Sequence, residues 1–277
     1  MGRRQGTMDK ATQLIIKGDV FYHYFRRDAN AEAQRLYQEA IKIDPSLSQP
    51  YAELAYAQLN AWLYNWDPSM SDLDQALFNA KEAVERDDSE YYNHWILADV
   101  RLYRKEFGLA SDGYQVALDF AKTQAVPEEL RCMHVDWADM LLLTGDAKKA
   151  IEVATTAIQE SPLPERWFYW VLGWAYYVDE QYDKSLEALY RLGNPRDAIR
   201  KNVIANLVAL NRLQEADAHA KMFLKEEEAQ GITFNNPGGP VWPEMEKIED
   251  RVPFQDSKQL AIWKGHLETV FTQQIAP

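Results

Sequence analysis

A spacing of small and apolar residues recurs six times along this chain. In each copy a small residue is followed by apolar residues four, seven and, in most copies, eight positions later, and the copies begin at Ala33, Ala76, Ala110, Ala150, Ser185 and Ala216. Offsets of four and three place these side chains on one stripe of an α-helix. The copies start 31 to 43 residues apart, which scatters around the ~34 residues of a helix–turn–helix repeat. The spacing therefore predicts a solenoid of stacked helix pairs.

A partner helix is predicted before each stripe. Before the five later stripes a large residue is followed by a small or aliphatic one, as in Leu54-Ala55 and Leu172-Gly173. Gly145 and Asn211 lie where paired helices should turn, and both tolerate the left-handed geometry that ends a helix. The predicted pairs span 11–26 with 29–43, 48–64 with 71–87, 90–103 with 106–123, 128–143 with 147–160, 165–178 with 182–193, and 197–210 with 213–229. Extra residues around 60–70 and 121–126 are expected in loops. The fold class is all-α.

Two segments carry a resemblance to a known family. Leu172-Gly173-x2-Tyr176, and the run from Gly145 through Ala150 to Pro162, resemble the tetratricopeptide repeat (TPR) family. The resemblance covers roughly residues 14–229 and implies a right-handed superhelical solenoid of about six repeats. A narrower resemblance, in Trp62–Pro68 and Pro253–Leu260, is to repeat arrays C-terminal to bacterial class III adenylate/guanylate cyclase or winged-helix regulator domains. The sequence contains no segment that resembles a cyclase or DNA-binding domain, so we expect no catalytic role to transfer.

The repeat pattern divides the chain into four parts. They are an N-terminal leader (1–10), the solenoid (11–229), a Pro/Gly-rich connector (230–256), and a C-terminal capping helix with a tail (257–277). The run from Asn235 to Pro240 is incompatible with a helix. Helical spacing returns in the last part, and one stripe of it should cover the apolar face of the last repeat: Leu260, Trp263, Leu267, Val270 and Phe271.

Composition restricts the class of partner. The 277 residues carry a formal net charge of −13, with 43 acidic and 30 basic side chains. This field disfavours nucleic acid and anionic lipid, and it favours basic partners. A single cysteine, Cys132, excludes an intramolecular disulfide, which favours a reducing compartment. No apolar run approaches the length of a membrane span, so we predict a cytoplasmic protein without membrane insertion.

The chain lacks the sequence signatures of catalysis. It has no Gly-x4-Gly-Lys phosphate loop, no His-Glu-x2-His and no Gly-x-Ser-x-Gly. We therefore predict no enzyme activity, no catalytic residues and no cofactor. Cys132, His134 and Asp136 are spaced by two, which does not bring helical side chains to one ion. No metal site is predicted, and we expect His94 and His134 to pack between helices.

The first helix of each pair lines the concave groove of such a solenoid, and this is where a binding site is expected. The predicted groove positions carry mainly aromatic and Asp side chains: Tyr56, Tyr92, Trp95, Asp99, Asp136, Asp139, Trp167, Trp170, Trp174 and Tyr177. TPR domains that grip C-terminal carboxylates carry Lys, Asn and Arg there, so that function is not expected. Aromatic rings beside carboxylates suit a cation or an amphipathic helix. The alternative is that some of Trp167, Trp170 and Trp174 only pack the solenoid.

These observations favour a non-enzymatic adaptor or scaffold that binds a basic or amphipathic protein segment in the groove. One alternative is a sensor module that binds a small cationic or aromatic ligand in a Trp/Tyr/Asp pocket, and another is a self-assembling scaffold. No obvious capping segment covers the first repeat as the C-terminal helix covers the last one, so Phe21, Tyr24 and Phe25 are expected to be partly exposed. That surface predicts a homo-oligomer through the N-terminal repeat.

Overall fold

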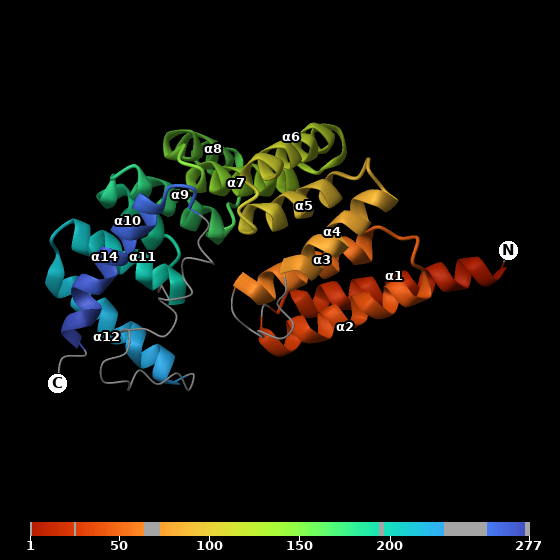
Figure 1. The fold of residues 1–277 in the computed structure, drawn as a ribbon, viewed down its shortest axis with the longest axis horizontal. Coiled ribbons are helices and arrows are strands. Elements are labelled where there is room, and N and C mark those ends of the chain that lie inside the picture. The colour runs from red at the N-terminus through yellow and green to blue at the C-terminus, as the bar shows by residue number, and fades with distance from the viewer. Residues whose placement is uncertain (1, 25, 64–72, 194–196, 230–253, 275–277) are drawn as a thin grey trace. The chain divides into compact units, whose positions relative to one another are not determined.

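The computed structural model describes residues 2–24, 26–63, 73–193, 197–229 and 254–274. Within these ranges the regular secondary structure consists of thirteen α-helices, labelled in Figure 1. The chain divides into two compact units, Met1–Val126 and Pro127–Pro277, called the first and second unit below. The sequence predicts an all-α fold, and the structure confirms it.

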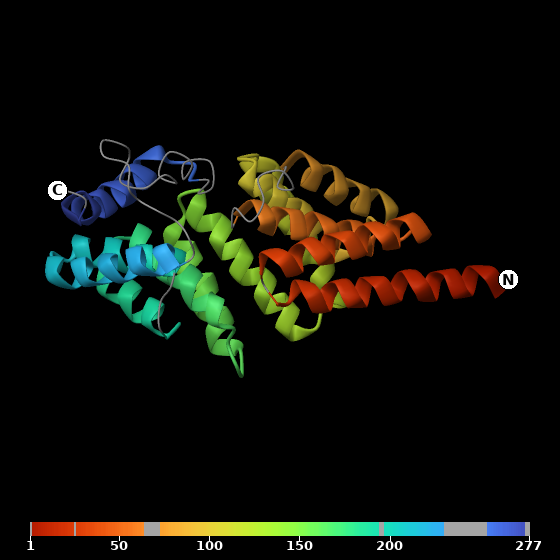
Figure 2. The ribbon, with the colours of Figure 1, turned by 90° about the horizontal axis from the view of Figure 1, so that it is seen from below.

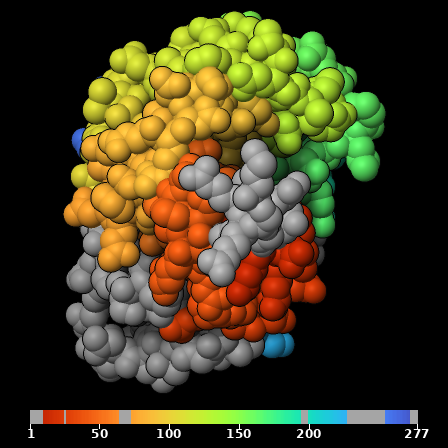
Figure 3. Space-filling model, turned by 90° about the vertical axis from the view of Figure 1, so that its right-hand side faces the viewer, coloured from red at the N-terminus to blue at the C-terminus, as the bar shows by residue number. Residues whose placement is uncertain are grey.

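Three helix pairs form the first unit: α1 (Gly2–Tyr22) with α2 (Arg27–Ile43), α3 (Gln49–Leu63) with α4 (Leu73–Arg86), and α5 (Tyr91–Tyr103) with α6 (Phe107–Gln124). Each helix packs against its partner, and α3 also packs against α1 and α5. The first helices α1, α3 and α5 therefore form one continuous layer. The surface of these six helices runs from red to yellow-green in Figure 3.

The second unit contains three more pairs and one further helix. The pairs are α7 (Pro127–Leu143) with α8 (Ala147–Glu160), α9 (Arg166–Val178) with α10 (Tyr182–Tyr190), and α11 (Asp197–Ala209) with α12 (Leu213–Ala229). Helix α14 (Ser257–Gln274) follows and packs against α11 and α12 (Figures 1 and 2). All six predicted helix pairs are present.

The recurring small residues allow paired helices to approach closely. Their side chains are fully buried at every copy: Ala33, Ala76, Ala110, Ala150, Ser185 and Ala216. The Ser185 hydroxyl donates a hydrogen bond to the carbonyl oxygen of Gly173 at 2.7 Å. A Cβ added to Gly173 would lie 2.8 Å from the side chain of Leu189. The repeat spacing thus marks the helix surfaces that make the closest contacts within each pair.

Four turns between paired helices share one backbone geometry. Lys105, Gly145, Glu180 and Asn211 all have positive φ, between 57° and 100°. The next residue donates its N–H to the carbonyl five residues earlier, as Glu106 does to Arg101 at 2.9 Å. This is the Schellman motif, which satisfies the last carbonyls of the first helix. The motif at Gly145 and Asn211 is the predicted one, whereas Lys105 and Glu180 adopt it although Lys and Glu are uncommon at positive φ.

The two ends of the chain add detail to the predicted organisation. Helix α1 begins at Gly2, so residues 2–10 of the predicted leader (1–10) are part of the first helix. Helix α14 buries the predicted capping stripe, and its Phe271 ring lies 5.7 Å from that of Phe223 in α12. Residues 230–253 of the predicted connector lie outside the described part of the chain, as do residues 64–68 of the Trp-rich insertion.

Candidate functional site

Aromatic and acidic side chains gather on the layer formed by α1, α3 and α5. Each helix contributes two residues spaced by three, and together they make up the acidic–aromatic cluster: Asp19 and Tyr22, Glu53 and Tyr56, Tyr92 and Trp95. The ring centroids of Tyr22 and Tyr56 are 5.5 Å apart. Those of Tyr92 and Trp95 are 5.8 Å apart, edge to face. Because the three helices are adjacent, residues far apart in sequence come together here.

Hydrogen bonds hold the side chains of the acidic–aromatic cluster in place. The Tyr92 hydroxyl donates to Glu53 Oε2 at 3.1 Å, which links α5 to α3. On the α1 side, the Tyr37 hydroxyl of α2 donates to Asp19 Oδ1 at 2.8 Å. Asn60 Nδ2 donates to Tyr22 Oη, also at 2.8 Å. These bonds fix ring and carboxyl positions across four helices.

Both carboxyl groups of the cluster have perturbed acidity. Burial raises the pKa of Glu53 to about 8, and the nearby Asp19 raises it further, while hydrogen bonds from Tyr92 and Gln49 lower it. Burial also raises the pKa of Asp19 above its usual range. No ion pair to Glu53 is formed by the residues that the structure describes. Added positive charge would therefore stabilise the ionised carboxylates.

Three of the predicted site residues, Tyr56, Tyr92 and Trp95, belong to this cluster. Asp99, also predicted, is only 7 % exposed and accepts a hydrogen bond from the Tyr114 hydroxyl of α6. This bond joins the two helices of the third pair. Asp99 therefore contributes to helix pairing in the first unit.

The sequence reasoning missed Asp19 and Glu53, although its own spacing points to them. Glu53 stands two residues before Ala55, the small residue of α3. Asp19 follows Gly18, where an added Cβ would lie 2.5 Å from the Tyr37 ring. Both residues stand at groove positions. The predicted site residues begin at Tyr56, which left out Asp19, and include only aromatic and Asp side chains, which left out Glu53.

In the second unit, Trp174 and Tyr177 contact the chain's own C-terminal segment. The Trp174 ring lies 5.5 Å from the rings of both Phe254 and Trp263. Tyr177 Oη lies 2.7 Å from His266 Nδ1, within hydrogen-bond distance. Both residues are less than a tenth exposed. Helix α14 thus covers part of the face that α9 was predicted to offer to a partner.

The other predicted residues of the second unit lie on α7 and α9, which pack against each other. Asp136 and Asp139 on α7, and Trp167 and Trp170 on α9, are all half-buried. Burial raises the pKa of the Cys132 thiol to about 11, and the nearby Asp136 carboxylate adds to this effect. That thiol stays protonated at neutral pH, which does not suit a nucleophile or a metal ligand.

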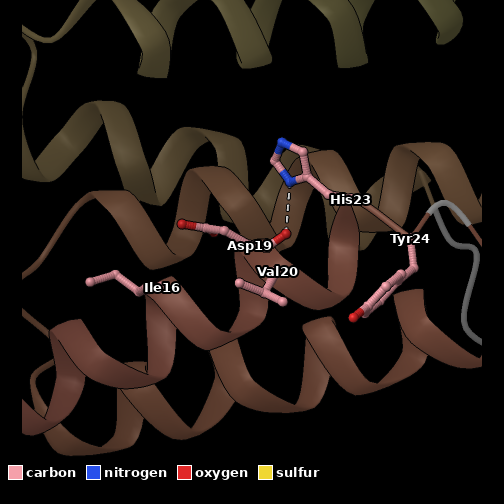
Figure 4. Close-up of a pocket in the computed structure, with 5 residues that line it drawn as sticks. All are labelled: Ile16, Asp19, Val20, His23 and Tyr24. Carbon is pink, nitrogen blue, oxygen red and sulfur yellow. Dashed lines mark hydrogen bonds between the residues drawn. The ribbon is translucent and has the colours of Figure 1, made fainter.

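A stripe of exposed apolar side chains follows one side of α1. Ile16 and Val20 of α1 and Tyr24, in the turn directly after it, are spaced by four and are 58 %, 55 % and 61 % exposed. Together with Asp19 and His23 they line an open hollow of about 470 Å³ (Figure 4). His23 Nδ1 lies 2.7 Å from the backbone oxygen of Asp19. This apolar stripe of α1 is a second surface feature of the first unit.

The described part of the chain gives little evidence for metal binding or for membrane insertion. No group of three or more His, Cys, Asp or Glu side chains there is placed to hold a metal ion. None of the helices described combines the length and apolar content that a membrane crossing requires. His94 packs between helices as expected, with its ring stacked 5.7 Å from Phe120 and its Nε2 2.8 Å from the Asp88 carbonyl oxygen.

Comparison with known proteins gives one sequence relative and several structural ones. No family model matches the chain. Putative adenylate cyclase 3 of Rhizobium meliloti is 30% identical over 96 residues, which is 34% of this chain and 16% of that protein. The chain thus matches less than a fifth of that relative's length.

Two solved structures resemble most of the chain. PilF of Pseudomonas aeruginosa has a TM-score of 0.55 and 14% identity, covering 88% of this chain and 99% of that one. A chain of the APC/C hetero-tetramer Cut9–Hcn1 has a TM-score of 0.54 and 15% identity, covering 79% and 45%. At these identities the similarity concerns the fold alone. With its six helix–turn–helix pairs, the chain has the fold of tetratricopeptide repeat proteins.

Proposed function

We propose that this chain is a non-enzymatic interaction module that binds a basic or amphipathic protein segment on the layer formed by α1, α3 and α5. The acidic–aromatic cluster carries the proposal, because it places two carboxyl groups among four aromatic rings on adjacent helices. Basic side chains are attracted both by carboxylates and by ring faces. Apolar side chains of the same segment would pack on the remaining ring surface.

The second unit offers an intramolecular parallel for this kind of recognition. Helix α14 has an apolar stripe that includes Trp263, and it also carries Lys258 and Lys264. Aromatic side chains of α9 accommodate it. A helix of mixed apolar and basic character is therefore compatible with the first helices of this fold.

For the second unit we propose a binding surface of its own, formed by the remaining predicted residues Asp136, Asp139, Trp167 and Trp170. Trp174 and Tyr177 would reach a partner only after α14 leaves. The single cysteine, which has no intramolecular disulfide partner, agrees with a cytoplasmic location. The structurally similar Cut9–Hcn1 chain belongs to a hetero-tetramer, so this fold is compatible with assembly with other proteins.

The test is selection from a library of helical peptides with the 18-residue length of α14. Apolar positions are fixed, and the others vary among Lys, Gln and Glu. Selected peptides should carry net positive charge and bind less tightly as salt rises. Trp95→Ala should weaken their binding by roughly 30-fold, since a buried aromatic anchor contributes about 2 kcal/mol.

Phe78→Ala is the matched control, because Phe78 is an exposed aromatic residue on α4, outside the layer of first helices. It should bind the selected peptides like the wild type. Circular dichroism would establish that both variants are folded. Selection of neutral or acidic peptides, or equal effects of the two variants, would contradict the proposed function.

We propose a second copy of this chain as the partner of the apolar stripe of α1. Three apolar side chains, two on α1 and one in the turn directly after it, are each more than half exposed and support this self-association. A two-fold contact would bury the same stripe on both copies.

A further inference from the structure

We infer that Glu53, with the rings of Tyr22, Tyr56 and Tyr92, forms a site for a single alkylammonium group. This inference rests on the proposed function for the source of that group, which is a lysine side chain of the bound segment. A free small amine would present the same chemistry, and the experiment below separates the two sources.

The site combines one carboxyl group with rings from three helices. Tyr92 reaches Glu53 directly, through the hydroxyl that donates to Oε2 at 3.1 Å. Burial and the Glu53 carboxyl raise the pKa of the Tyr92 phenol, and Tyr56 and Tyr22 add to this effect. A carboxylate attracts an ammonium ion through its full negative charge, and an aromatic ring attracts it through the ring quadrupole.

The rings are held in position before any ligand arrives. Asn60 Nδ2 donates to Tyr22 Oη at 2.8 Å, and Trp95 packs edge to face on Tyr92. Tyr56 packs against the Tyr22 ring. Little side-chain freedom remains to be lost on binding, so a compact ligand can be recognised by few contacts.

The hydrogen bonds to Glu53 favour ammonium over guanidinium. A carboxylate offers about four acceptor positions, and Tyr92 and Gln49 already use acceptor capacity of Glu53. An arginine fork needs two parallel bonds to both oxygens in one plane. An ammonium ion acts as a compact point charge and needs only one open direction, which suits a partly occupied carboxyl group.

Binding at this site is coupled to release of a proton. With a pKa of about 8, Glu53 is mostly neutral at neutral pH when the site is empty. A bound cation favours the ionised form and lowers that pKa, so affinity rises as pH rises through the value of the empty site. The ionised fraction grows from about a tenth at pH 7 to about nine-tenths at pH 9, which predicts about tenfold tighter binding.

Other titratable groups around Glu53 do not reverse the expected rise of affinity with pH. The groups around it are Asp19 and Tyr22 of α1, Tyr37 of α2, Tyr56 of α3 and Tyr92 of α5, and His23, directly after α1, acts on Asp19. Burial raises the pKa of the Tyr37 and Tyr92 phenols above their usual range, so both keep their protons across this window. Ionised Asp19 adds negative charge and supports binding.

The experiment uses choline as the probe, because its charge does not change with pH. Binding to the full chain is followed by NMR of ring-labelled tyrosine, and 3,3-dimethyl-1-butanol is the neutral isostere. Choline should bind about tenfold more tightly at pH 9 than at pH 7, and the isostere should not bind. Glu53→Gln should abolish the pH dependence and most of the affinity. Glu85→Gln removes a carboxylate from an exposed position on α4 and should leave both unchanged.

Tyr56→Leu is the second variant, since it removes a ring without altering Glu53. It should weaken choline binding at both pH values and retain the pH dependence. Choline binding that is independent of pH, or unaffected by Glu53→Gln in a folded protein, would overturn the inference.

Peptides from the selected library identify the source of the ammonium group. Replacing a single lysine of the peptide by norleucine should weaken its binding to the wild-type protein. The loss should equal the loss that the lysine peptide shows on the Glu53→Gln variant. If arginine at that position binds as tightly as lysine, the ammonium assignment is wrong. Choline binding without any peptide binding would support the site and contradict the proposed function. Basic peptides that bind independently of Glu53 would support the proposed function and contradict the site.

Discussion

Replacing Trp263 with alanine should release helix α14 from the first helices of the second unit. Trp263 is 3 % exposed, and its ring lies 5.5 Å from that of Trp174. Truncation of a buried Trp to Ala costs about 3–5 kcal/mol. The indole Nε1 has no hydrogen-bond partner among the described residues, so its removal relieves part of this cost. We expect about 3 kcal/mol.

The loss should appear as local opening of α14, because this helix packs at the end of the repeats and opens without unfolding them. A cost of about 3 kcal/mol raises the opening constant by roughly 100-fold. The pairs α7/α8 and α9/α10 should stay folded. Hydrogen exchange read by mass spectrometry measures this directly, since peptides from 257–274 report on α14 alone.

Two controls make the measurement specific. Glu268→Ala changes an exposed position on the same helix and should leave exchange in α14 within a fewfold of the wild type. Peptides from the first unit should exchange equally in all three proteins. If α14 exchanges equally in wild type and Trp263→Ala, the Trp174–Trp263 contact does not hold this helix, and the reasoning fails.

Two further predictions concern stability. Glu226→Gln should lower the free energy of unfolding by about 2 kcal/mol, because it leaves the fully buried Arg200 guanidinium without the carboxylate 2.8 Å away; an unchanged urea midpoint would contradict this. Gly173→Ala should destabilise by about 1–2 kcal/mol, since overpacking against Leu189 outweighs the gain in helix propensity. The control Gly108→Ala meets no atom within 4 Å and should stabilise slightly in the same thermal denaturation.

The helix pairs were predictable because one physical cause repeats. Each pair buries small residues such as Ala76 and Ala150 completely. This requirement produces a spacing in the sequence that can be recognised within one repeat, without knowing how the neighbouring repeats pack. The division into two units at Val126 was not predicted. The extra residues around 121–126 were expected in a loop, whereas α6 continues to Gln124. Local spacing indicates where helices pack, but not where one compact unit ends and the next begins.

The candidate site was predictable only in part. The groove positions Tyr56, Tyr92 and Trp95 follow from register within a single helix. The hydrogen bond from Tyr92 to Glu53 joins residues 39 positions apart and depends on how α3 and α5 are placed. Likewise, the apolar stripe of α14 indicates that Trp263 is buried, but not that Trp174 lies against it. Pairings between helices need the tertiary structure.

Self-association through α1 is the last prediction, and its size follows from a narrow surface. Ile16 and Val20 of α1 and Tyr24 of the turn after it form one narrow surface, so a two-fold contact falls below the roughly 1,200 Å² of a stable interface. We expect weak association that rises with concentration in sedimentation velocity. Val20→Lys places two like charges at the two-fold contact and should keep the chain monomeric. Leu109→Lys, at a 50 % exposed position on α6, should associate like the wild type. Two outcomes would show that this stripe is not a self-association surface. One is a wild-type chain that stays monomeric at high micromolar concentration, and the other is an equal loss of association in both variants.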